Sequence, residues 1–168
     1  TGDIDFRSRV ASDEEAQFLA SSVAGMPLGP TYADLDRAPV VLLVGLEPED
    51  ESPIIFLRLR RAAQKKGVRI VSLSPVRTRG MDKMDAQWWA CQPGGEAVAL
   101  RQITEQAGDT LAALRQPGAV ILVGERMAGV PAPERLVDHA LRMLDPHADR
   151  ERFRLQEYAG VMQHREGV

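Results

Sequence analysis

Four carboxylates follow an apolar, β-branched run that ends in a glycine. The run spans residues 40–44, Gly45 ends it, and the acids are Glu47, Glu49, Asp50 and Glu51. Carboxylate oxygens are ligands for divalent cations, so a metal site is one interpretation. The spacing matches no EF-hand loop, and acids in the first turn of a helix are ordinary helix chemistry. We therefore expect no metal here, and interpret the acids as a polar rim or as a surface for a basic partner.

The same charges disfavour nucleotide binding at this loop. A phosphate-binding loop needs several glycines for close backbone approach and an open helix N-terminus. Here Gly45 is followed by Leu46 and Glu47. Each carboxylate within a few ångströms of a pyrophosphate would cost on the order of 1 kcal/mol at intermediate dielectric. The acids would also compete with a phosphate for the positive end of a helix that begins at Pro53.

Other residue types that could carry chemistry are sparse. One cysteine, Cys91, excludes an internal disulfide and an iron–sulfur cluster held by this chain alone, because clusters usually take four Cys ligands. No His lies near Cys91 in the sequence, so we expect a small, buried or half-buried side chain after Trp88-Trp89. The two tryptophans suit a core contact or a partner contact equally well. The histidines match no usual zinc spacing and are predicted to be solvated: His139, His147 and His164.

The elements that position these residues follow a strand–helix–strand plan. The apolar run at 40–44 predicts a strand buried on both faces of a parallel sheet. Ser52 is expected to cap a helix that begins at Pro53 and stops at Gly67. One face of that helix should lie on the sheet, and its residues are Ile55, Leu59, Ala62 and Ala63. A second strand is predicted from Val68 to Leu73.

Downstream we expect a loop at 74–93, a helix from Gly95-Glu96 to about Gln106, a short helix from Thr110 to Leu114 and a strand at 119–123 that ends in Gly124. In an open α/β sheet, ligands bind beyond the carboxyl ends of the strands. That edge, called the rim below, would be made by residues 45–52, 74–80 and 124–130.

The chain divides into three predicted parts: an N-terminal approach helix and link at 1–30, an α/β domain at 31–130, and a helical tail at 131–168. Ser12 and Glu15 form a capping box for a helix that runs to about Val23. In the tail Leu136, Ala140 and Leu144 share a helical face, and the charged end from residue 147 is either a docking helix or partly disordered.

Composition bounds the function. The 168 residues suffice for one α/β domain with a core, and 27% charged residues with a net charge of -3 give no electrostatic case for nucleic acid. The basic helix face at 58–66 lacks the aromatic residues that single-strand binding needs, and is predicted to be solvated or subunit-facing. No apolar run approaches the ~20 residues of a membrane-spanning helix. A start at Thr1 without Met suits a piece of a longer polypeptide.

Two stretches resemble the molybdopterin-oxidoreductase superfamily: VVLLVGLEPEDESPIIFLRLRRAAQKKGVRIVSLSPVRTRGM and, downstream, QPGGEAVALRQI. That superfamily writes an apolar strand, G-x-N-P, a Pro-started helix, Lys-Gly, a strand, D-P-R-x-T and then P-G-T-D. The large iron–sulfur subunits of bacterial NADH-quinone oxidoreductase (respiratory complex I) look very similar, including FRSRVASDEEAQFLA, TYADLDRAP and LRQPGAVILVGER. The resemblance covers residues 3–127 and implies a three-layer α/β, largely parallel, Rossmann-like fold.

The departures from the superfamily pattern fall where its cofactor-bearing members grip a guanine dinucleotide. The resemblance implies vestigial cofactor positions here, at Gly45, Glu47, Ser74, Thr78, Gly95 and Glu96. The Asn of G-x-N-P is replaced by Glu47, the Asp of D-P-R by Ser74 and its Arg by Val76. We therefore expect no catalytic residue, no bound cofactor and no metal in this chain.

The function that the resemblance implies is a scaffold domain in the peripheral arm of complex I, on the cytoplasmic side of the plasma membrane. The complex passes electrons from NADH to quinone, and the domain's partners would be other peripheral-arm subunits. The 4Fe–4S and 2Fe–2S clusters would lie in an N-terminal part of the large subunit that this chain does not contain.

An alternative is the pterin-dinucleotide domain of a molybdenum oxidoreductase such as a formate dehydrogenase, with its ligand at residues 45–48, 74–78 and 93–96. A stand-alone binding module would explain neither the motif match nor the start of the chain.

Overall fold

A mostly parallel β-sheet with helices on both faces is the framework of this chain. The structure, a computed structural model, describes residues 30–106, 108–129, 155–156 and 161–163. The strands lie in the order β3-β2-β1-β4-β6-β5. They are β1 (Val40–Val44), β2 (Arg69–Ser74), β3 (Gln87–Ala90), β4 (Val120–Val123), β5 (Leu155–Gln156) and β6 (Val161–Gln163).

Strand β1 is the centre of the sheet. All five of its residues have no solvent-accessible surface, as the continuous apolar run predicted. It pairs in parallel with β2 on one side, Leu42 opposite Val71, and with β4 on the other, Leu42 opposite Ile121. Strand β3 extends the parallel part beyond β2, whereas β6 runs antiparallel to β4. The prediction of a largely parallel α/β sheet is confirmed.

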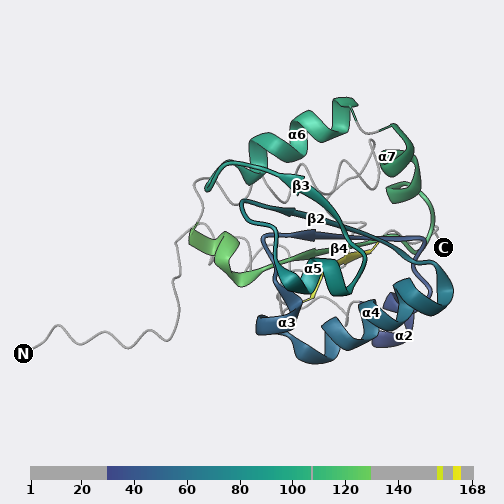
Figure 1. Cartoon of the computed structure of the whole chain (residues 1–168). Helices are drawn as coiled ribbons and strands as arrows, with labels where there is room; N and C mark the ends of the chain where they lie inside the picture. Colours follow the sequence, from purple (N-terminus) through teal and green to yellow (C-terminus); the bar gives the residue numbers. More distant parts are fainter. Residues whose placement is uncertain (1–29, 107, 130–154, 157–160, 164–168) are drawn as a thin grey trace, which may run out of the picture.

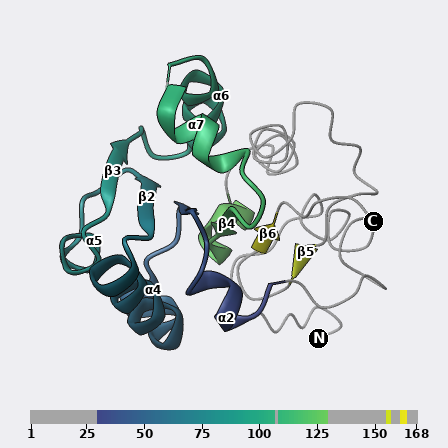
Figure 2. The same cartoon turned by 90° about the vertical axis from the view of Figure 1, so that its right-hand side faces the viewer.

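The helices form two layers around the sheet (Figures 1 and 2). They are α2 (Tyr32–Leu35), α3 (Pro48–Glu51), α4 (Pro53–Lys66), α5 (Arg79–Lys83), α6 (Glu96–Gln106), α7 (Gly108–Leu114) and the 3₁₀ helix η1 (Glu125–Gly129). Alternate β1 residues face opposite layers, as the two-residue period of a strand requires. Val41 and Leu43 pack with Leu59 of α4, while Leu42 packs with Leu100 of α6.

Helix α4 has the bounds and the buried face that its sequence predicts. Pro53 is its first residue, and Gly67 ends it with a left-handed φ of 69°. The face expected on the sheet is buried or partly buried there: Ile55, Leu59, Ala62 and Ala63. The prediction for Ser52 was wrong in its chemistry. Ser52 occupies the cap position, but its side chain makes no capping hydrogen bond, because the residue also ends α3 and its N–H donates to the Pro48 carbonyl.

The segment at 74–93, predicted as a loop, contains a helix and a strand. Helix α5 is a single turn started by the Thr78 hydroxyl, too short to leave a periodic pattern. Strand β3, with the sequence QWWA, lies at the sheet edge, where half-buried residues give no clean alternation. The acidic loop after Gly45 likewise contains the short helix α3.

The prediction of a helical tail was wrong for the tail residues that the structure describes. Residues 155–156 and 161–163 form an antiparallel pair, β5 and β6, that adds to the β4 edge of the sheet. Strand pairing at a sheet edge overrides a local helical pattern, because it satisfies backbone groups that the edge would leave open. The predicted helix at 12–23, the link at 26–30 and the helical face at 136–144 lie outside the described residues.

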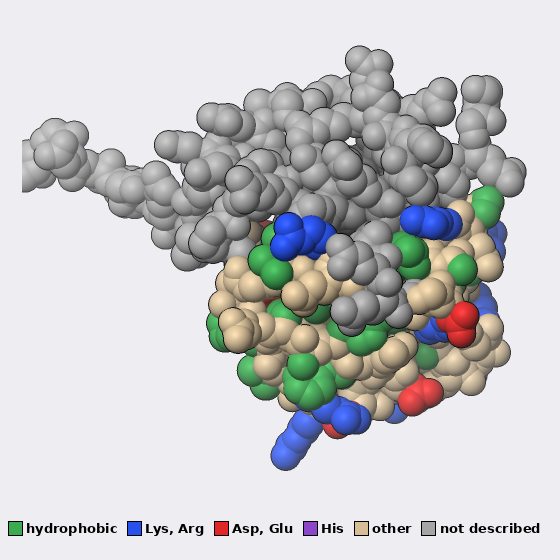
Figure 3. Space-filling view, turned by 90° about the horizontal axis from the view of Figure 1, so that it is seen from above, with side chains coloured by type: hydrophobic (Ala, Val, Ile, Leu, Met, Phe, Trp, Pro, Cys, Tyr) green, Lys and Arg blue, Asp and Glu red, His purple; other side chains and the backbone are tan. Residues whose placement is uncertain are grey.

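Polar and apolar side chains share the surface above α6, which Figure 3 views from the top. Within residues 30–106 and 108–129, no helix has both the length and the apolar character needed to cross a bilayer.

The central packing can be tested at α4 with a matched pair. Leu59 is fully buried against the sheet, and Leu57 of the same helix is 60% exposed. Leu59→Ala should lower the free energy of unfolding by about 2–5 kcal/mol, because it opens a cavity in the core. Leu57→Ala should change it by less than about 0.5 kcal/mol. Urea unfolding of the purified variants measures both, and equal effects would contradict this packing.

Candidate functional site

The rim lies where the sequence placed it, at the carboxyl ends of three neighbouring parallel strands. Because β2, β1 and β4 are adjacent, the segments that follow them meet at one edge of the sheet. The Gly45 N–H donates to the Leu73 carbonyl at 2.9 Å, and the Gly124 N–H donates to the Val44 carbonyl at 2.9 Å. These bonds continue the strand ladders into the rim.

Two glycines at the rim are packed against the chain's own atoms. A Cβ on Gly124 would lie 2.8 Å from the Gly45 carbonyl carbon and 2.9 Å from Leu46 Cα. Gly45 has a φ of 57°, and a Cβ there would lie 2.6 Å from the sulfur of buried Met127. A nucleotide-binding loop uses such glycines to bring its backbone close to a phosphate. Here the close approach is made to η1 and to the start of the β4 loop.

Glu47 joins the loops that follow β1 and β2. It is 6% exposed and sits at the cap position of α3, where its Oε1 accepts from the Glu49 N–H at 3.2 Å. Its Oε2 accepts a hydrogen bond from the Thr78 hydroxyl. The same hydroxyl accepts from the Met81 N–H at 3.3 Å and so starts α5. Both oxygens of Glu47 are therefore used inside the chain, and one carboxylate organises two helix starts.

Gly80 provides the space for this carboxylate. A Cβ at Gly80 would overlap Oε1 of Glu47 and lie 3.1 Å from its Cδ. Ser74, at the end of β2, is also bonded locally. Its hydroxyl donates to the Val76 carbonyl at 2.8 Å, and its carbonyl accepts from the Trp88 indole N–H at 3.0 Å.

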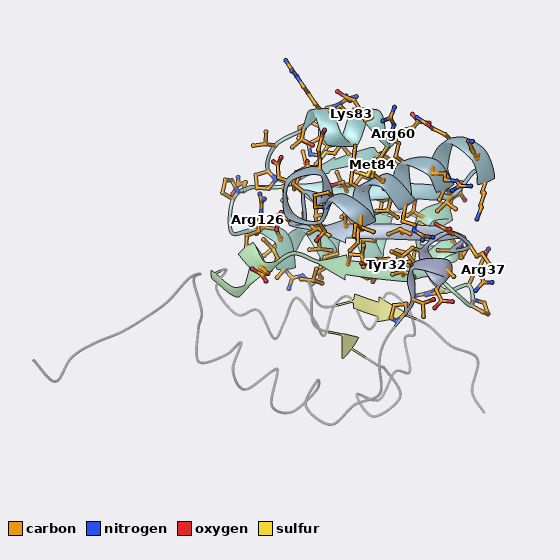
Figure 4. The ribbon with its side chains drawn as sticks, turned by 90° about the horizontal axis from the view of Figure 1, so that it is seen from below. Tyr32, Arg37, Arg60, Lys83, Met84 and Arg126 are labelled. Carbon is orange, nitrogen blue, oxygen red and sulfur yellow. The ribbon has the colours of Figure 1, made fainter. Side chains whose placement is uncertain are left out.

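The acidic residues of α3 pair with cations from two other elements. Lys83 of α5 forms an ion pair with Glu49, and Arg126 of η1 pairs with Glu51 at 2.6 Å. Figure 4 labels both cations on their separate elements. A basic partner for these acids was one expectation from the sequence, and the chain supplies two cations itself. No group of three or more His, Cys, Asp or Glu suited to a metal ion occurs in the part of the chain that the structure describes.

Gly95 and Glu96 lie one strand further along the sheet, after β3, at the start of α6 on the opposite face. Glu96 is 2% exposed, and its Oε2 has no hydrogen-bond partner among the described residues. Burial, together with the Glu96 charge, raises the pKa of the Cys91 thiol to about 11. Cys91 is half-buried against the α6 core, as expected for a structural side chain.

The structure thus brings three predicted positions into contact, Gly45, Glu47 and Thr78, and leaves Gly95 and Glu96 apart from them. Four residues that complete the rim were missed from the sequence: Gly80, Lys83, Arg126 and Met127. Their types gave no signal, because only the fold reveals that they face Gly45 and the acids. Both tryptophans are half-buried, and Trp89 packs on the α6 core. The three histidines lie outside the described residues.

The fold and rim agree with a comparison of the sequence to protein families. The family described as Molybdopterin oxidoreductase matches residues 3–130. Because this match covers most of the 168 residues, the chain belongs to that family.

Within the family, the chain is similar to one respiratory protein, the G subunit of NADH-quinone oxidoreductase. It is 53% identical over 143 residues to that protein of Mycobacterium bovis, covering 82% of this chain and 17% of the relative. The Mycobacterium tuberculosis protein of the same name matches equally. The Streptomyces coelicolor protein of that name is 45% identical over 150 residues, 77% of this chain and 18% of the relative. The chain therefore spans less than a fifth of these relatives.

The glycine contact at the rim can be tested by adding one methyl group. Gly124→Ala should destabilise the fold by about 1–3 kcal/mol, because its Cβ would overlap the Gly45 backbone, which cannot rotate away. Gly108→Ala is the control, since a Cβ there meets nothing within 4 Å. Thermal and urea unfolding measure both, and a neutral Gly124→Ala would contradict the close packing of the two loops.

The raised pKa of Cys91 predicts a slow thiol. A pKa of about 11 in place of 9.0 lowers the thiolate fraction at pH 8 on the order of 100-fold, and only the thiolate reacts. Alkylation by iodoacetamide should be correspondingly slow and should accelerate as pH rises toward 11. Glu96→Gln should speed the reaction at pH 8 by removing a negative charge. Reaction at the rate of a free cysteine would contradict the burial of this thiol.

Proposed function

We propose that this chain is a scaffold domain of the large iron–sulfur subunit of NADH:quinone oxidoreductase, and that it binds no cofactor itself. Its similarity to the corresponding protein of three actinobacteria supports the assignment to this subunit. The family match supports descent from a domain that gripped a pterin dinucleotide. The domain would hold the shape of the large subunit and present surfaces to neighbouring peripheral-arm subunits.

The observation that carries the proposal is the occupation of the rim by the chain's own side chains. A dinucleotide's phosphates need open backbone at Gly45 and a positive environment beyond it. Met127 packs on Gly45, and Glu47 lies on Gly80 with both carboxylate oxygens hydrogen-bonded. A phosphate at this place would meet a buried carboxylate in a site of low dielectric. These residues do not fit the diphosphate of a pterin dinucleotide.

The proposal assigns electron transfer to other parts of the large subunit. The 4Fe–4S and 2Fe–2S clusters of the expected N-terminal part need several cysteines, and this chain has one. The large subunit would lie on the cytoplasmic side of the plasma membrane, held to the membrane part of the complex through its neighbours.

The scaffold role predicts a separation between stability and turnover. Glu47→Gln, placed in the full-length protein, keeps the shape of the side chain but weakens its bonds to Thr78 and Glu49. The domain should lose about 1 kcal/mol of stability. NADH:quinone turnover per assembled complex should stay within about twofold, because no reacting group is touched. A large loss of turnover in fully assembled complex would contradict the scaffold role.

The alternative, a pterin-dinucleotide domain, predicts binding of guanine nucleotides. A ligand that binds only the native state raises the unfolding temperature by mass action. We expect no shift with millimolar GDP, for the native chain or for Glu47→Gln. A concentration-dependent rise in the native chain would favour the alternative.

A further inference from the structure

Helix α4 carries five cations and no carboxylate. They are Arg58, Arg60, Arg61, Lys65 and Lys66, on a chain whose net charge is -3. Asp36 pairs with two of them, with Arg58 at 3.0 Å and with Lys66 at 3.8 Å. Arg60, Arg61 and Lys65 are exposed and form no ion pair within the described residues. Three cations on one short stretch of helix repel one another unless an anionic surface meets them.

The solvent side of α4 also carries exposed apolar side chains. Ile54 is 57% exposed and Leu57 is 60% exposed. Leu57, Arg61 and Lys65 follow at helical spacing, so the two apolar side chains continue directly into the cations on one face. Figure 4 looks onto this helix from below and shows Arg60 extending from it. We call these five residues the α4 docking face: Ile54, Leu57, Arg60, Arg61 and Lys65.

We propose that the α4 docking face binds an acidic protein surface with an apolar centre, presented by a neighbouring subunit of the assembled complex. This inference rests on the proposed function, because it needs a complex for the chain to join. Carboxylates on the partner would neutralise Arg60, Arg61 and Lys65, and the apolar centre would cover Ile54 and Leu57. Such a charged border around an apolar centre is the usual anatomy of a protein interface.

The observations favour a protein over a membrane or a nucleic acid. The main apolar face of α4, with Phe56 and Leu59, is buried on the sheet. Ile54 and Leu57 alone offer far less apolar area than an interfacial membrane helix presents. The docking face has no aromatic side chain on which a base could stack. A protein surface needs neither a wide apolar stripe nor stacking, because charge complementarity and a small apolar centre suffice.

The share of its relatives that this chain represents leaves room for such a contact. The matched region is 17–18% of the relatives' length, so most of the surface of such a protein lies outside it. A domain set within a large subunit of a multi-subunit enzyme must use some surface for contacts. The α4 docking face is where the described residues leave both unpaired charge and exposed apolar area together.

The test reverses charge on the docking face in the full-length protein. Arg61→Glu with Lys65→Glu should lower the amount of this protein retained in the purified complex about tenfold or more, because like charges would then face each other. Arg101→Glu with Arg115→Glu is the matched control, since both arginines are exposed and lie on other elements. Retention of both double variants at the level of the unmodified protein would overturn the proposal.

A photo-crosslinking amino acid in place of Leu57 keeps the test decisive if the charge reversal unfolds the protein. Its control position is Val98, which is 51% exposed on α6. In the purified complex, Leu57 should crosslink to an acid-rich segment of another subunit. Crosslinks to lipid or to the same polypeptide, or no more product than at Val98, would overturn the proposal. If the unmodified protein itself is absent from the NADH-oxidising complex, the proposed function fails first.

Discussion

The buried carboxylate of Glu47 is the contact on which the arrangement of the rim depends. Parallel strands fix only where their loops begin, and loops carrying several acids would otherwise separate by repulsion. Glu47 bonds to its own helix α3 and, through the Thr78 hydroxyl, to the start of α5. A buried carboxylate is costly unless its oxygens are hydrogen-bonded, so this bonding keeps the two loops together. The ion pairs of Lys83 and Arg126 then neutralise further acids of α3.

The same geometry explains how a nucleotide-type fold can serve without a nucleotide. Glycines such as Gly45 and Gly80 permit close approach, and the approaching group can be a phosphate or a side chain. In this chain the approaching groups are the Met127 thioether and the Glu47 carboxylate. An anionic side chain at the place of an anionic ligand keeps the loops positioned while removing the need for the ligand. Under the proposed function, the fold is retained because its core and its outer surfaces still serve the complex.

Much of the fold could be predicted from the sequence, because its strongest signals are local. The apolar run at 40–44 and the periodic face of α4 fix β1, the first helix layer and the position of the rim. Strand β3 and helix α5 could not be predicted, since QWWA is a short edge strand and α5 is one turn held by a long-range bond to Glu47. The contacts that fill the rim escaped for the same reason. Met127 lies far beyond Gly45 along the chain, and nothing local relates them.

The most direct test of the central claim is elemental analysis of the complex that contains the full-length protein. The tagged protein would be purified gently with its partners, and iron and molybdenum would be measured together, with the iron showing that the complex is intact. Abundant iron, with molybdenum no higher than in a preparation from an untagged strain, is the result that the scaffold account predicts. Molybdenum in a stoichiometric amount would contradict the account, because the rim would then have to open and hold a pterin.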